Sequence, residues 1–161
     1  MTAKEIIEKA LSFPMDHVTE RYARDNDISL DVAKEHEIEL KRFLALCSIN
    51  PHKSYGMAGV TDELWHTFIF HTKSYFEFCS SINGSYIHHT PEPSDEKSNL
   101  SPYVEMLKDY ENVFGQASPK HIWPDIKNSN ISGSACGTSC SRCGHGCSSC
   151  GHGCRGCTSC H

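Results

Sequence analysis

Apolar residues recur three and four positions apart through most of the first 115 residues, the spacing that places side chains on one face of an α-helix. Residues 3–12 follow this spacing and stop before Pro14, which predicts a short first helix. A second helical segment is expected around residues 18–23. The longest helix of the N-terminal half is predicted to begin after Ser29, a favourable N-cap residue, and to end before Pro51.

The next periodic segment, GVTDELWHTFIFHTKSYFEFCSSINGS, predicts one helix of about twenty residues. Thr61 is its expected N-cap, and Asn83 and Gly84 are its expected stop. We expect His71 to be a buried, hydrogen-bonded histidine and Cys79 to be a small hydrophobic residue. Both belong to a stripe of mainly core side chains, which comprises Leu64, Phe68, His71, Tyr75, Phe78, Cys79 and Ile82.

A last helix is predicted over the segment YVEMLKDYENVFG, with Ser101 as N-cap, Pro102 at the first helical position and Gly115 as the stop. Ile122 and Trp123 follow and are expected to pack on the core. Because no long stretch alternates with period two, the fold class is mostly α. We predict a compact helical domain over residues 1–127, a linker over 128–135, and a tail over 136–161 that is either disordered or organised by metal.

Composition indicates which partners and which cellular compartment to expect. The 15 basic and 20 acidic residues give a net charge of −5 without a basic cluster, which argues against nucleic-acid binding. No apolar stretch is long enough for a membrane helix, and the N-terminus lacks the apolar core of a secretory signal. We therefore expect a cytoplasmic protein, in which a reducing environment favours clustered cysteines as metal ligands over disulfides.

The tail contains eight cysteines and three histidines, and its cysteines alternate at spacings of four and three, which produces a seven-residue repeat, CGHGCSS followed by CGHGCRG. Its glycines make a free helix costly and it has almost no apolar residues, so only a bound ligand is expected to order it. Thiolates bind zinc, copper(I) and iron–sulfur clusters, and we expect zinc, with copper(I) or an iron–sulfur cluster as alternatives. The predicted ligands are Cys136, Cys140, Cys143, Cys147, Cys150, Cys154, Cys157 and Cys160, with His145, His152 and His161.

The helical domain offers a possible second metal site. Asp62 and His66 are four residues apart and therefore neighbours on one helix face, where they could share a metal ion or a hydrogen bond. Cys79, His88 and His89 are further candidate ligands. On an unbroken helix His66 and Cys79 lie about 20 Å apart, too far for one ion. Adjacent residues of an extended segment point to opposite sides, so only one of the two later histidines is expected to face inward.

Four short motifs, DELWHTFIFHTKSYFEFC, YIHHTP, YENVFG and IWPD, resemble the glycine-rich domain-containing protein-like family. The resemblance covers roughly residues 62–125 and implies a helical module of bacterial proteins with relatives in plant glycine-rich domain proteins. A Gly- or Cys-rich C-terminal segment is a familiar companion of that module, and the family is poorly characterised. The resemblance places six residues at motif positions: Trp65, His66, Tyr75, Cys79, His88 and His89.

Three functions remain open at this point. The favoured hypothesis is a non-enzymatic protein whose metallothionein-like tail binds metal ions for storage, buffering or delivery, with a possible metal-receiving partner protein. The first alternative is a ribosomal peptide precursor, in which the helical domain is a recognition leader and partner enzymes modify the tail. The second is a metal-dependent enzyme that uses His66, His88 or His89 and a metal-bound water.

Overall fold

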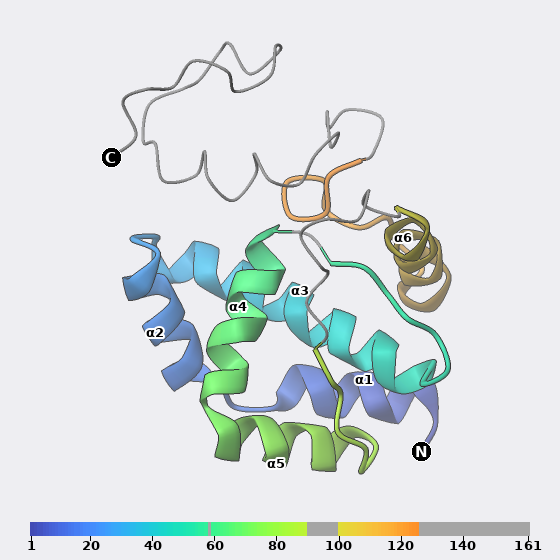
Figure 1. The fold of residues 1–161 in the computed structure, drawn as a ribbon, viewed down its shortest axis with the longest axis horizontal. Helices are drawn as coiled ribbons and strands as arrows, with labels where there is room; N and C mark the ends of the chain where they lie inside the picture. The colour runs from blue at the N-terminus through green and yellow to red at the C-terminus, as the bar shows by residue number, and fades with distance from the viewer. Residues whose placement is uncertain (58, 90–99, 126–161) are drawn as a thin grey trace.

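The computed structural model describes residues 1–57, 59–89 and 100–125 and confirms the mostly α fold. Within these ranges there are six helices and no strand (Figure 1). The predicted linker and the predicted tail, with all eleven of its candidate ligands, lie outside the described residues. The helices are α1 (Ala3–Ser12), α2 (Asp16–Asp25), α3 (Leu30–Ile49), α4 (Gly59–Phe70), α5 (Thr72–Ile82) and α6 (Ser101–Phe114).

Helix α3 passes through the middle of the bundle and contacts α1, α2, α4 and α6 (Figure 1). Ser29 caps its N-terminus as predicted, because the Ser29 hydroxyl accepts a hydrogen bond from the Val32 amide at 3.3 Å. Leu40, Phe43 and Leu44 are almost completely buried at its centre. No helix in the described ranges combines the length and the apolar composition that crossing a bilayer requires.

A buried carboxylate connects α6 and the segment after it to α3. Glu39 is 4% exposed, and its Oε2 accepts hydrogen bonds from the Tyr110 hydroxyl and the Trp123 indole, each at 2.8 Å. Its Oε1 accepts a third bond from Arg42 at 2.8 Å. Trp123 is fully buried, as expected, because its ring packs on the core while its polar N–H is satisfied by Glu39.

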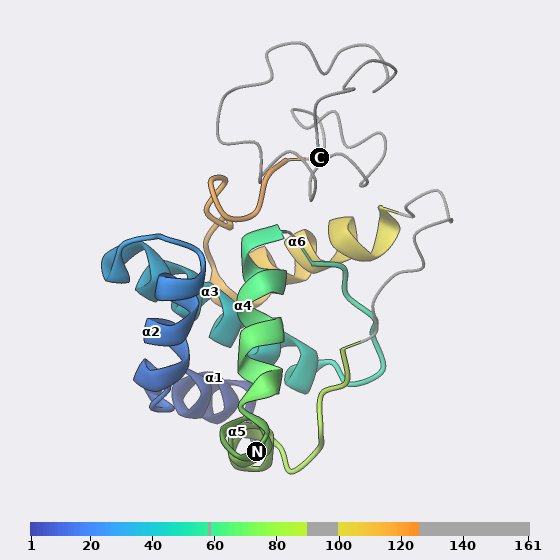
Figure 2. The ribbon, with the colours of Figure 1, turned by 60° about the vertical axis from the view of Figure 1, so that its left-hand side comes forward.

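The predicted single helix across residues 61–83 is wrong, because the chain breaks at His71 into α4 and α5. The His71 amide bonds to the Phe68 carbonyl at 3.0 Å, which frees the Thr67 carbonyl from its usual helical donor. The His71 Nδ1 lies 2.9 Å from that carbonyl and takes the place of the donor. Helix α5 therefore lies across the end of α4 (Figure 2) and packs on α1.

Two predicted helix starts are also displaced. Helix α4 begins at Gly59, so Thr61 is a buried residue of its first turn and not the N-cap. Helix α6 begins at Ser101 with Leu100 at the N-cap position, which puts Pro102 second in the helix. Its predicted end is confirmed, because Gly115 adopts φ +66°, a left-handed conformation that glycine adopts at little cost.

Candidate metal centre

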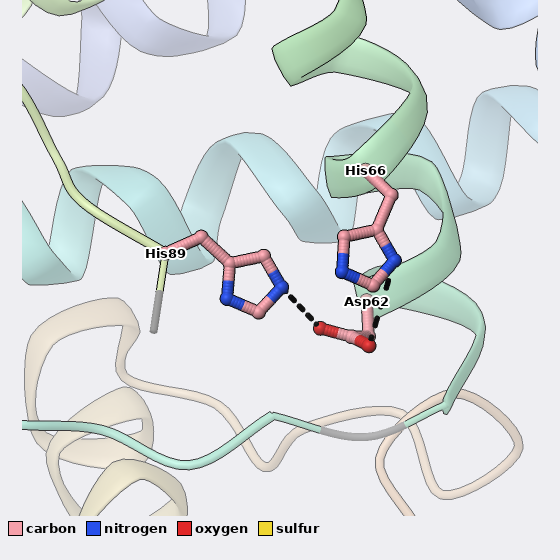
Figure 3. Close-up of side chains that lie close together, drawn as sticks. All are labelled: Asp62, His66 and His89. Carbon is pink, nitrogen blue, oxygen red and sulfur yellow. Dashed lines mark ion pairs between the residues drawn. The ribbon is translucent and has the colours of Figure 1, made fainter. Parts of the chain in front are cut away.

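Asp62 and His66 lie one turn apart on the same face of α4, as their spacing predicts (Figure 3). The His66 Nδ1 is 3.8 Å from the Asp62 Oδ2. Their side chains are 41% and 34% exposed, so both can be reached from solvent.

His89 joins this pair from a distant part of the chain. After α5 the chain turns at Gly84, which adopts φ +72°, and residues 86–89 run back towards α4 without regular secondary structure. The His89 Nε2 reaches 2.9 Å from the Asp62 Oδ1 (Figure 3). This contact does not have the geometry of an N–H···O hydrogen bond, so the buried Nε2 atom has no hydrogen-bond partner. A bound ion is one of the explanations for such an atom.

The imidazole of His89 is held by ring stacking on two neighbouring residues of α4. Its centroid lies 4.4 Å from that of Trp65 with the planes 5° apart, and 4.6 Å from that of His66 with the planes 13° apart. Only 13% of the His89 side chain is exposed. His89 is therefore the fixed member of the group, whereas the more exposed His66 has room to turn.

Among the described residues, Asp62, His66 and His89 form the one group of three or more histidine, cysteine or acidic side chains that could hold a metal ion together. One ligand atom from each lies within 4.8 Å of the others. Two imidazoles and one carboxylate suit a borderline divalent metal such as zinc or iron(II). The same residues without a metal would form a histidine–carboxylate pair.

The other candidate ligands of the helical domain do not join the group. Cys79 is 1% exposed in α5, where burial raises the pKa of its thiol, so it is the small core residue that the sequence predicts. His88 is exposed and packs against Tyr86, with the ring centroids 5.0 Å apart. Of the adjacent pair, only His89 faces inward.

The sequence interpretation assigned Tyr75 to the core and missed its hydroxyl. This group accepts a hydrogen bond from the Trp65 indole at 3.0 Å and donates one to the Ile87 carbonyl at 2.5 Å, two residues before His89. The signal available in the sequence was the presence of a tyrosine at a buried position, because a buried phenol usually has a hydrogen-bond partner.

In the comparison with known families, residues 3–101 match a family model described as UCP032817-like. The match covers α1 to α5 and includes all three residues of the candidate metal centre. Comparisons with curated proteins and with solved structures give no match.

Proposed function

The chain belongs to the UCP032817-like family, and from this premise we propose that it is a metal-binding protein. The helical domain binds one divalent ion through Asp62, His66 and His89. The tail binds further, softer metal through its thiolates and serves storage, buffering or delivery. The observation that carries the proposal is the convergence of three ligand atoms, from residues up to 27 positions apart, within 4.8 Å of one another.

The separations support a single ion. With bonds of about 2.0–2.2 Å, two ligand atoms on one ion lie at most about 4 Å apart. The Asp62 carboxylate oxygens already meet this limit, at 2.9 Å from His89 and 3.8 Å from His66. Because the two imidazole planes are nearly parallel, one ring has to turn before both lone pairs point at the ion. His66 is the ring that turns, since the stack on Trp65 fixes His89.

The ligand types predict different metals for the helical domain and for the tail. Two nitrogens and one oxygen favour zinc, iron(II) or another borderline divalent ion, whereas magnesium and calcium prefer all-oxygen sites. The tail thiolates also suit copper(I). The cytoplasm, which the sequence predicts as the compartment, would keep those thiols reduced. Three protein ligands leave at least one coordination position of a tetrahedral ion for water or an incoming ligand, a property that suits exchange and delivery.

We propose binding and not catalysis. A surface cavity of about 540 Å³ lies between Lys53 and the start of α6, and none of the residues that line it belongs to the metal group. His88, one of the residues of the enzymatic alternative, is exposed, packs against Tyr86 and is not part of the metal group.

Metal binding by the domain is tested in the tail-substituted chain, defined as the full-length protein in which the eight tail cysteines and three tail histidines are serine. Equilibrium dialysis against zinc, followed by elemental analysis, should give one bound ion per chain. His66→Ala and His89→Ala should each weaken binding by more than the roughly 10–100-fold that loss of an outer-shell partner costs. The matched control is His88→Ala, which should bind like the parent chain. Equal binding by all four chains would refute the domain site.

Metal binding by the tail has a separate test. The wild-type chain, purified under reducing conditions, should contain more metal than a shortened chain ending at Lys127, and a chelator should remove the excess. Equal metal content in both would refute this part of the proposal. The precursor alternative instead predicts covalent mass changes confined to the tail after coexpression with the partner enzymes that modify it. A chelator would not reverse these changes.

A further inference from the structure

The segment that carries His89 lies outside any helix, so its backbone needs other partners to keep a fixed position. Ile87, two residues before His89, has such a backbone partner. The Ile87 carbonyl accepts the Tyr75 hydroxyl at 2.5 Å. Tyr75 is completely buried in α5, and the bond to Ile87 is partly buried.

Cys79 lies one turn further along α5 than Tyr75 and is also buried. Burial raises the pKa of the Cys79 thiol. Ile87 is therefore held at α5 by the hydrogen bond from the buried Tyr75 hydroxyl. Ile87 and His89 are both partly buried, whereas His88 between them is exposed, so fixing Ile87 also aims His89.

Trp65 connects this anchor to the ligand. Its indole N–H donates to the Tyr75 hydroxyl at 3.0 Å, and its ring stacks on His89 at 4.4 Å. The Tyr75 hydroxyl thus binds both the backbone that leads to His89 and the ring on which His89 rests. Burial raises the pKa of this hydroxyl, so it keeps the proton that it donates to Ile87.

We propose that Tyr75 is the positioning residue of the metal centre, whose hydroxyl fixes His89 at Asp62 by holding the Ile87 carbonyl and the Trp65 indole together. The proposal rests on the proposed metal site. It also gives a role to four of the six motif residues: His66 and His89 as ligands, with Trp65 and Tyr75 as the frame that holds His89.

The test uses cobalt(II) as the probe in the tail-substituted chain, because its visible absorption reports both binding and the ligand set. Tyr75→Phe keeps the buried ring and removes only the hydroxyl. We expect it to weaken cobalt binding about tenfold, the lower end of what loss of an outer-shell partner costs, and to change the absorption bands.

Tyr110→Phe is the matched control. Tyr110 is also completely buried, and its hydroxyl also has two partners, Glu39 and Arg42, which are not part of the metal group. Its loss should lower stability without changing cobalt affinity or spectrum. Equal weakening by both variants would mean general destabilisation and would overturn the proposal.

Wild-type affinity and spectrum in Tyr75→Phe would also overturn the positioning role, while losses in His66→Ala and His89→Ala would leave the metal site standing. No cobalt binding in the parent chain would instead refute the proposed metal site of the helical domain, on which this inference rests. Should circular dichroism show that Tyr75→Phe is unfolded, Trp65→Phe takes its place, since it keeps an aromatic ring but removes the N–H that binds Tyr75. It must weaken cobalt binding several-fold, and unchanged binding would overturn the proposal.

Discussion

Replacing Glu39 by glutamine should destabilise the folded protein strongly, although the substitution changes neither size nor shape. The carboxylate accepts three hydrogen bonds, from Arg42, Tyr110 and Trp123, and only 4% of the residue is exposed. Glutamine offers one oxygen and one NH2 group in the same place. If its oxygen faces Tyr110 and Trp123, its NH2 group faces the donors of Arg42.

The expected cost follows from these contacts. A hydrogen bond to a charged group contributes about 1.5–3 kcal/mol, and removing one partner of a buried ion pair costs about 3–5 kcal/mol. The Arg42 side chain is 23% exposed and can turn partly towards water, which lowers the cost. We therefore expect Glu39→Gln to lower the free energy of unfolding by about 2–4 kcal/mol.

The measurement is urea denaturation followed by circular dichroism at fixed pH. Glu35→Gln is the matched control on the same helix, because Glu35 is 60% exposed and its contact with His121 is 3.3 Å long. Loss of such an exposed pair should cost less than about 0.5 kcal/mol. Equal small effects of both substitutions would refute the claim that Glu39 joins α6 to α3. Zinc affinity of the tail-substituted chain should be unchanged by Glu39→Gln.

Three further predictions concern the described helices. Burial lowers the pKa of His36 below its ordinary value of 6.5, so the free energy of unfolding should fall as the pH drops from 6.5 through the folded pKa. In a pH series of denaturation curves, His36→Gln should weaken this dependence. The same pH dependence in the variant and the wild type would contradict this. Cys79 should resist iodoacetamide in the native protein and react in urea, as peptide mass spectrometry can show, because its thiol is buried and its pKa is raised; labelling at equal rates would be inconsistent with that burial. Gly115→Ala should cost about 1–2 kcal/mol in the free energy of unfolding, because a side chain is strained at φ +66° even though none of the surrounding atoms would clash with it; Gly115→Asn should cost less, and a stable alanine variant would refute the strain.

Helical periodicity predicted the α class and most helix ends, but it could not predict the break at His71. The apolar stripe continues across the break, with Phe68 on one side and Tyr75 on the other, so the pattern looks like one helix. The break depends on a contact between the His71 imidazole and the Thr67 carbonyl and on the packing of α5 against α1. The first is a local contact that competes with the helical hydrogen bond, the second is a tertiary contact, and the spacing of apolar residues encodes neither.

The same limit applies to the metal centre. Helical spacing predicted that Asp62 and His66 are neighbours, and alternation predicted that only one of His88 and His89 faces inward. That His89 reaches Asp62 depends on the direction of α5 and on the anchor at Ile87, which follow from the break. The argument that kept His66 and Cys79 apart assumed a straight helix, which is wrong, and Cys79 is not in the group of Asp62, His66 and His89.

The most direct test of the metal centre is zinc K-edge X-ray absorption on the tail-substituted chain loaded with one equivalent of zinc. Two imidazole nitrogens and one or more oxygens at about 2.0–2.2 Å are expected in the first shell, without sulfur. His89→Ala should remove one imidazole from that shell, and His88→Ala should leave it unchanged. A sulfur ligand, or the same spectrum from the His89→Ala chain, would contradict the assignment of Asp62, His66 and His89 as the metal site.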